Sequence, residues 1–151
     1  MKTNYKVISL YCFTQIKENL ISELRDKLLN FESYDISGLI ILGEEGINGT
    51  FCGHEEIVNK LFSFIKEFCN TNDLNEKISF SDKKIFKKLK VRIKSEIVTI
   101  GIKDVNPISK RGTYVDANKW NEFIEDEDTI LIDTRNHYEV SLGTFKNAIN
   151  P

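Results

Sequence analysis

The pattern of apolar and polar residues predicts a strand at the start of the chain, followed by a helix. Residues 5–13 (YKVISLYCF) are rich in β-branched and aromatic side chains, and both alternating faces are apolar, as in a strand inside a sheet. Thr14 is a candidate cap for a helix over residues 15–31. The apolar residues of that helix recur at intervals of three and four: Ile16, Leu20, Ile21, Leu24, Leu28 and Leu29.

The next segment predicts a hairpin, a second helix and a fourth strand. Residues 39–42 and 47–52 are short apolar runs, and Gly43-Glu-Glu-Gly46 between them is typical of a hairpin connection. Residues 54–69 carry a second apolar stripe at helical spacing, formed by Ile57, Val58, Leu61, Phe62, Ile65 and Phe68. Residues 77–80 (KISF) are the fourth predicted strand.

The order of these elements, βαββαβ, predicts an α+β domain of the ferredoxin-like kind. Such a domain has an antiparallel sheet with both helices on one face. A doubly wound parallel sheet would need a helix between residues 42 and 47, where there is no room for one. We therefore assign residues 1–102 to a ferredoxin-like N-terminal domain with a basic extension over 83–94.

The rest of the chain divides into further pieces. Residues 81–102 are interpreted as a separate piece, strand-like from Val91 to Ile102. Residues 103–113 contain Pro107 and Gly112 and predict a linker. In residues 114–151, Asp116 is expected to cap a short helix, and residues 129–133 to form a buried strand. One face of that helix would present Trp120, Phe123 and Ile124.

Composition narrows the protein class. Of 151 residues, 40% are hydrophobic and 29% charged, which favours a folded domain over disorder. No apolar run reaches the roughly 20 residues that span a bilayer, and no signal peptide is recognised, so we expect a cytoplasmic protein. Three cysteines (Cys12, Cys52, Cys69) and two histidines (His54, His137) fit neither a disulfide framework nor a metal site. Each cysteine is interpreted as a small buried apolar residue.

A basic run stands out in a chain whose net charge is −2. Seven of the twelve residues from 83 to 94 are cationic: Lys83, Lys84, Lys87, Lys88, Lys90, Arg92 and Lys94. If part of this run is a strand, one face carries Lys88, Lys90, Arg92 and Lys94, and the other carries Leu89, Val91 and Ile93. Aligned cations beside Phe86 suit the phosphates and bases of single-stranded RNA. The alternative is a solvated strand edge that lysines protect from aggregation.

The segment Gly43-Glu-Glu-Gly-Ile-Asn-Gly49 is a second candidate. Its three glycines allow close backbone approach, and Glu44 or Glu45 is a candidate base or substrate-orienting group. The alternative, which we favour, is a tight hairpin with a polar tip. Acylphosphatase activity, known on this fold, would need a phosphate-cradling loop with an arginine after the first strand. Residues 12–17 (CFTQIK) contain neither arginine nor glycine, so this activity is not expected.

The last segment, ILIDTRNHYE over residues 130–139 followed by Gly143 and NAINP, resembles the start of a rhodanese domain. Asp133 and Arg135 would lie at the carboxyl end of a strand, where α/β folds place their sites. Glu139 is predicted within reach of Arg135 for a charge-assisted hydrogen bond. An ion pair that only fixes the loop is the alternative.

Three segments together resemble the tRNA uridine(34) hydroxylase family over essentially the whole chain: GEEGINGT at 43–50, LKVRIKSEIVT at 89–99 and KRGTY at 110–114. The resemblance implies oxygen-dependent hydroxylation of the wobble uridine of tRNA to 5-hydroxyuridine, with molecular oxygen as co-substrate and no other cofactor identified. It implies the tRNA anticodon region as partner; neither a membrane nor DNA is expected. It also implies a catalytic rhodanese cysteine beyond Pro151 and a cysteine-rich tail.

These interpretations give a specific picture. Residues 1–102 would bind tRNA through the seven cations, residues 114–151 would pack incompletely, and the 151 residues alone would catalyse nothing. Two alternatives remain open. One is a rhodanese-type sulfurtransferase, and the other is a non-enzymatic RNA- or protein-binding module.

Overall fold

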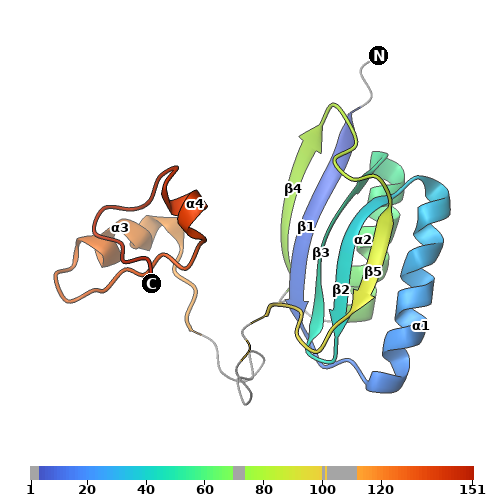
Figure 1. Ribbon diagram of the computed structural model, residues 1–151, viewed down its shortest axis with the longest axis horizontal. Helices are drawn as coiled ribbons and strands as arrows, with labels where there is room; N and C mark the ends of the chain where they lie inside the picture. The colour runs from blue at the N-terminus through green and yellow to red at the C-terminus, as the bar shows by residue number, and fades with distance from the viewer. Residues whose placement is uncertain (1–3, 70–73, 100, 102–111) are drawn as a thin grey trace. The chain divides into compact units, whose positions relative to one another are not determined.

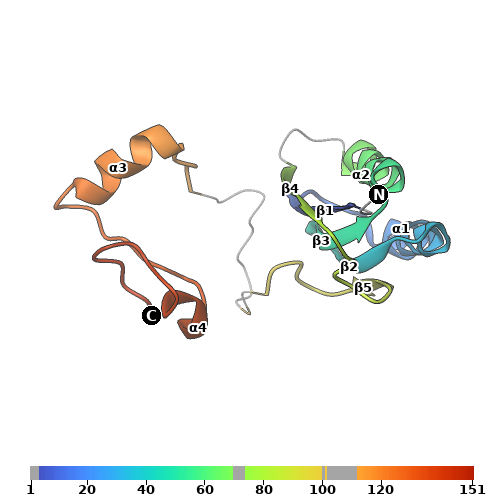
Figure 2. The same ribbon diagram turned by 90° about the horizontal axis from the view of Figure 1, so that it is seen from above.

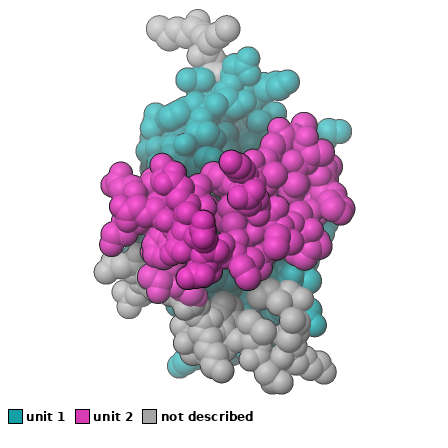
Figure 3. All heavy atoms as spheres, turned by 90° about the vertical axis from the view of Figure 1, so that its left-hand side faces the viewer, with its two compact units in different colours: residues 1–111 teal, residues 112–151 magenta. Residues whose placement is uncertain are grey.

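The chain forms two compact units, Met1–Arg111 and Gly112–Pro151 (Figure 3). The computed structural model of the protein describes residues 4–69, 74–99, 101 and 112–151. Most of the predicted linker, 103–113, lies outside the described residues. In the part of the chain that is described, no helix has the length and apolar character needed to cross a membrane.

The first unit is built on a five-stranded sheet in the order β4-β1-β3-β2-β5 (Figure 1). Its strands are β1 (Tyr5–Phe13), β2 (Ser37–Gly43), β3 (Gly46–Gly53), β4 (Asn75–Ser81) and β5 (Leu89–Ile93). The first four strands pair antiparallel, which confirms the predicted ferredoxin-like α+β arrangement. β5 pairs parallel with β2. The sequence had not predicted this fifth strand as part of the sheet.

Two helices, α1 (Glu18–Leu29) and α2 (Glu55–Cys69), cover one face of the sheet (Figure 2). A short 3-10 helix, η1 (Asn30–Tyr34), extends α1. The predicted cap at Thr14 is wrong, because α1 starts after Lys17 without a side-chain cap. Instead, the backbone N–H groups of Thr14 and Ile16 donate to the carbonyl oxygens of Glu45 and Glu44 at 3.0 and 2.8 Å.

The core lies between this sheet face and the two helices. Alternate residues of β1 point toward the helices and are fully or almost fully buried: Ile8, Leu10 and Cys12. They meet Leu24 and Leu28 of α1 and Leu61 and Ile65 of α2 in one buried cluster. All three cysteines are buried, as predicted. Neither α1 nor α2 lies on the opposite face of the sheet (Figure 2).

The interpretation of residues 81–102 as a separate piece is wrong. Residues 82–88 carry the chain from β4 across the top end of the sheet in Figure 1 to β5. Leu89 and Val91 are buried, so β5 belongs to the sheet and completes the core beside α1. The strand also ends at Ile93, not at Ile102, because the following residues fold onto the β2–β3 hairpin.

Ile97 is the anchor of that following segment. Its N–H donates to Oε1 of Glu45 at 2.6 Å, and its carbonyl oxygen accepts from Nδ2 of Asn48 at 2.8 Å. Its side chain is 2% exposed and packs on Gly43, where an added Cβ would lie 3.3 Å from Cγ2 of Ile97. Side chains thus pair both the N–H and the carbonyl group of Ile97. Its burial outside a strand therefore leaves no backbone hydrogen bond unmade. The packed domain therefore extends to Ile97.

The β2–β3 connection is the predicted tight hairpin, with Glu44 and Glu45 between Gly43 and Gly46. Gly46 has φ +142°, and a Cβ there would lie 2.0 Å from the carbonyl oxygen of Cys12. A side chain at this position would therefore force β1 and β3 apart. The close pairing of the hairpin with β1 requires glycine at residue 46.

The second unit contains two helices, α3 (Ala117–Glu125) and α4 (His137–Val140). Asp116 caps α3 as predicted, accepting from the N–H groups of Asn118 and Lys119 at 2.9 and 3.2 Å. The predicted buried strand at 129–133 is wrong. Only an isolated bridge joins Ile132 to Ile149 within the described residues, and Ile130 is 74% exposed.

None of the described residues in the second unit is buried, which confirms the expectation that residues 114–151 pack incompletely. A strand needs sheet neighbours and covering helices to bury its apolar residues. The described part of this unit supplies a single bridging partner instead.

Replacing Gly46 with alanine should lower the free energy of unfolding by on the order of 2–3 kcal/mol, since the new Cβ overlaps the β1 backbone at a strained φ. Urea denaturation followed by circular dichroism measures this change. The control is Gly112→Ala, where nothing lies within 4 Å, and its stability should stay within about 0.5 kcal/mol of the parent.

Replacing Ile97 with alanine should lower the free energy of unfolding by about 2–5 kcal/mol, because it leaves a cavity in a buried site. Its neighbour Val98 is 43% exposed, so Val98→Ala should change stability by less than about 0.5 kcal/mol. Equal, small effects at both positions in the same urea titration would show that the domain ends at β5.

Candidate functional site

The first candidate site is the basic surface, defined as Lys83, Lys84, Lys87, Lys88, Lys90, Arg92 and Lys94. Within β5, Leu89 and Val91 are buried and Lys90 and Arg92 are exposed, as the alternation predicted. Ile93, predicted on the face of Leu89 and Val91, is 49% exposed at the end of the strand. Val91 pairs with the buried Ile40, whose side chain faces the helices. Lys90 and Arg92 therefore point to the face opposite α1 and α2.

The crossing segment 82–88 supplies the other side of this surface. Its position is fixed by an ion pair between Lys84 and Asp35 and by a hydrogen bond from the N–H of Gly38 to the carbonyl oxygen of Lys88, 3.1 Å long. Between this segment and the two strands lies a hollow of about 510 Å³. It is lined by Gly38, Leu39, Ile85, Phe86, Lys87, Lys88, Lys90 and Arg92.

The charges of the first unit are distributed unevenly. On the helices, Lys27 pairs with Glu23 and Lys60 with Glu56, each at 2.7 Å. These pairs lower the pKa of both glutamates through hydrogen bonds from the lysines. The open face instead gathers Lys90 and Arg92 on adjacent outward positions of one strand. Lys84 is less suited to bind a phosphate, because it already pairs with Asp35.

The hairpin 43–49 does not form a catalytic centre in this structure. Glu45 accepts the N–H of Ile97, and Asn48 donates to the carbonyl of the same residue. The favoured alternative, a tight hairpin with a polar tip, is therefore the observed one. The tip also accepts the N–H groups of Thr14 and Ile16, so these amides of the β1–α1 connection are not directed at a phosphate.

The described cysteines have the environment of structural thiols. A hydrogen bond with Cys12, together with burial, raises the pKa of the Cys69 thiol. A protonated, buried thiol is a poor nucleophile. Cys52 is also buried, and its Sγ lies 3.3 Å from the hydroxyl of Ser37.

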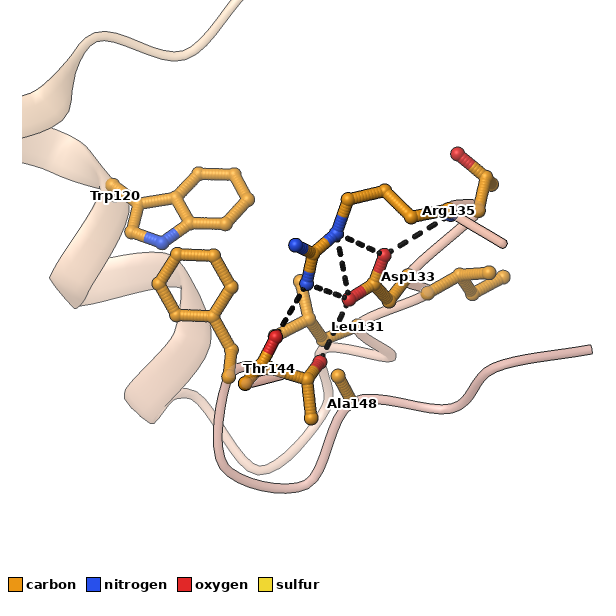
Figure 4. A pocket seen from close by; sticks show the side chains of 10 residues that line it. Trp120, Leu131, Asp133, Arg135, Thr144 and Ala148 are labelled. Atoms are coloured by element: carbon orange, nitrogen blue, oxygen red, sulfur yellow. Dashed lines mark hydrogen bonds and ion pairs between the residues drawn. The ribbon is translucent and has the colours of Figure 1, made fainter. Parts of the chain in front are cut away.

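The second candidate site is the loop with Asp133, Arg135 and Glu139. Arg135 donates to both carboxylate oxygens of Asp133, from Nε at 3.0 and 3.3 Å and from Nη2 at 2.6 Å (Figure 4). The hydroxyl of Thr144 donates to the same carboxylate at 2.7 Å. The Arg135 and Thr144 hydrogen bonds hold the pKa of Asp133 well below its usual range. A carboxylate held in this way is a weak base, so the pair fixes the loop and is not suited to accept protons near neutral pH.

Arg135 also donates to the carbonyl oxygen of Gly143 at 2.8 Å. The predicted bond between Glu139 and Arg135 is not present. Glu139 instead accepts from the backbone and side-chain N–H groups of Asn136 at 3.2 and 3.0 Å, which caps α4. Glu139 is the third residue of α4, so its carboxylate reaches back to Asn136 at the N-terminus of that helix and does not meet Arg135.

A hollow of about 520 Å³ lies beside this ion pair. Trp120 of α3 and Phe145 form one wall, with ring centroids 5.4 Å apart, and Asp133 and Arg135 form another (Figure 4). Nε1 of Trp120 is buried and has no hydrogen-bond partner among the described residues. The sequence had predicted Trp120 on an apolar helix face, but not its place beside the charged pair.

Sequence reasoning missed the contribution of β2 to the basic surface. Gly38 and Leu39 line its hollow because β5 pairs with β2, and β5 had been assigned to a separate piece. The signal available was the alternation over 89–93, which resembles a strand with one buried face. That pattern does not say which strand is its neighbour.

Comparisons with known proteins agree with the fold. The model of the UPF0176 acylphosphatase like domain matches residues 5–97. A tRNA uridine(34) hydroxylase of Prochlorococcus marinus strain MIT 9515 is 54% identical over 151 residues, covering 99% of this chain and 49% of that protein. One from Bartonella quintana strain Toulouse is 43% identical over 152 residues, covering 100% of this chain and 49% of that protein. The chain spans about half the length of the curated relatives it matches.

Among solved structures, an acylphosphatase from Coxiella burnetii has a TM-score of 0.41 and 12% sequence identity, covering 60% of this chain and 94% of that one. The ground state of BlsA has a TM-score of 0.44 and 17% sequence identity, and the match covers 81% of this chain and 85% of that one. The chain belongs to the UPF0176 family, the family of the curated tRNA uridine(34) hydroxylases.

Proposed function

We propose that this chain is the N-terminal part of a tRNA-modifying enzyme that hydroxylates the wobble uridine to 5-hydroxyuridine, with molecular oxygen as co-substrate. The observation that carries the proposal is the similarity, over 99% of the chain, to a protein named tRNA uridine(34) hydroxylase. The enzyme would act in the cytoplasm on the anticodon region of tRNA.

Within this proposal, the first unit binds tRNA through the basic surface. The support is physical. Lys90 and Arg92 project from one strand onto the face opposite α1 and α2, while Lys27 and Lys60 on those helices are paired with glutamates. Lysine and arginine bind phosphates by neutralising their charge and releasing counterions. Lys83, Lys87, Lys88 and Lys94 extend the same run of charge along the chain.

The chemistry of the proposed enzyme would reside outside these 151 residues. All three cysteines of the chain are buried, and the pKa of Cys69 is raised, so none has the environment of a catalytic thiolate. The second unit would be the start of a rhodanese domain, with the Asp133–Arg135 pair fixing its first loop. The remaining half of the relatives' length would supply the catalytic cysteine, and the 151 residues alone would be inactive.

Replacing Lys90 and Arg92 together with glutamine should weaken tRNA binding. Each lost phosphate contact should also reduce the slope of log K against log salt by about 1. Fluorescence anisotropy of labelled tRNA, titrated with the 151-residue chain at several salt concentrations, measures both quantities.

The matched control replaces Lys27 and Lys60 with glutamine, which removes the same charge from the helix-covered side. This variant should bind with nearly the parent's affinity and slope. Equal losses for the two double variants would show that binding depends on net charge and would contradict the proposed surface.

The chemical step is tested in cells. Nucleoside mass spectrometry of total tRNA from cells with and without the intact gene should show loss of 5-hydroxyuridine in the deletion. Loss of a thiolated base instead would identify the protein as a sulfurtransferase. An unchanged nucleoside profile would support a role in RNA binding alone.

A further inference from the structure

We propose that the hollow beside Phe86 holds one unpaired nucleobase, and that it makes the first unit select single-stranded over duplex RNA. This inference rests on the proposed function, because it takes RNA as the ligand of the basic surface. It adds a base-binding pocket, which the charge argument alone does not require.

The hollow has the apolar lining that a base face needs. Leu39 of β2 is half-buried and lies on the open face of the sheet, beside the outward positions of β5. Phe86 and Ile85 come from the crossing segment, and Ile85 is 47% exposed. An aromatic ring can stack on the flat face of any nucleobase, which gives affinity without strong sequence preference.

Cations also line the hollow, where they would bind the phosphates that flank a bound base. Lys90 and Arg92 are exposed and line it, together with Lys88 at the entry to β5. Outward residues two apart on a strand are about 6.6 Å apart, so these side chains form a row instead of a single point of charge. A row of cations beside an aromatic ring suits an extended strand whose base is turned inward.

The hollow is large enough to admit a nucleobase. Its volume of about 510 Å³ lies within the roughly 300–1,000 Å³ of small-molecule sites. The bases of a duplex are stacked and paired, so their faces cannot reach Leu39 or Phe86. An unpaired base in a loop can be turned out of its stack and inserted. The cations alone would accept either form of RNA, but the pocket would accept only the unpaired one.

The protein holds this pocket in place before any ligand arrives. The Gly38–Lys88 hydrogen bond and the Lys84–Asp35 ion pair fix both ends of the segment that carries Phe86. A Cβ at Gly38 would lie 2.4 Å from the carbonyl oxygen of Thr50, so the β2 backbone beside the pocket stays close to β3. Preorganisation of this kind reduces the entropy lost when a ligand binds.

The test compares two RNA probes of equal charge, a single-stranded oligouridylate and a blunt duplex, by anisotropy against the 151-residue chain. Phe86→Leu keeps the position apolar but removes the ring. It should weaken binding of the single strand by roughly five- to hundred-fold, the range expected for one lost base stack. The salt slope and the affinity for the duplex should not change, because both depend on the cations.

Two further variants guard against a simple folding defect. Phe86→Trp keeps an aromatic ring at this position, so it should bind the single strand about as well as the parent does. The fluorescence of the introduced tryptophan should be quenched when the oligouridylate binds. Phe80→Leu removes an aromatic ring that is 56% exposed on β4, and it should leave both affinities unchanged.

Each outcome decides between distinct possibilities. A parent chain that binds neither probe would overturn the proposed RNA surface itself, and with it the pocket. If the parent binds but Phe86→Leu affects both probes equally, or neither, the cations act without a base pocket and this inference is wrong. Absence of tryptophan quenching in a Phe86→Trp chain that binds RNA would overturn it as well.

Discussion

The two-residue turn between β2 and β3 is the point on which the first unit depends. Gly46 brings the hairpin so close to β1 that a Cβ would meet the carbonyl of Cys12 at 2.0 Å. From this position, the turn's carbonyl oxygens hold the start of the β1–α1 connection, and the Glu45 carboxylate holds Ile97. Three segments far apart in sequence therefore meet at one turn. Their burial is possible because polar groups at the turn satisfy the backbone N–H and carbonyl groups that no strand pairs.

Local patterns predicted the elements of the first unit well. The strand at residues 5–13 was predicted with its observed ends, because both of its faces are apolar and a polar connection follows. The two helices were recognised from apolar stripes at helical spacing, with ends that differ by a few residues. The errors occurred where a tertiary contact decides the structure. Ile97 belongs to a run rich in β-branched residues, which favours a strand. In the structure, the side chains of Glu45 and Asn48 make the backbone hydrogen bonds that a neighbouring strand would otherwise make.

In the candidate sites too, local features were predicted correctly and long-range contacts were not. The outward placement of Lys90 and Arg92 followed from strand alternation alone. Their neighbours Leu39 and Gly38 could not be foreseen, because the parallel pairing of β5 with β2 is a long-range choice. In the second unit, Asp116 was identified as a cap from its position before a helix, a local signal. The partner of Glu139 was predicted wrongly. Its nearness to Arg135 in sequence suggested a bond between the two, but Asn136 is the residue that donates to its carboxylate.

The structural role of the Gly43–Gly49 segment has a consequence for how such motifs are used. Glycines and acidic residues packed into seven positions invite comparison with an active-site loop, yet here they form a junction that joins parts of one domain. A search built on this segment would retrieve proteins that share the junction, whatever reaction they catalyse. Similarity in the Gly43–Gly49 segment is therefore evidence for a shared fold, whereas evidence for a shared reaction must come from the residues that carry it out.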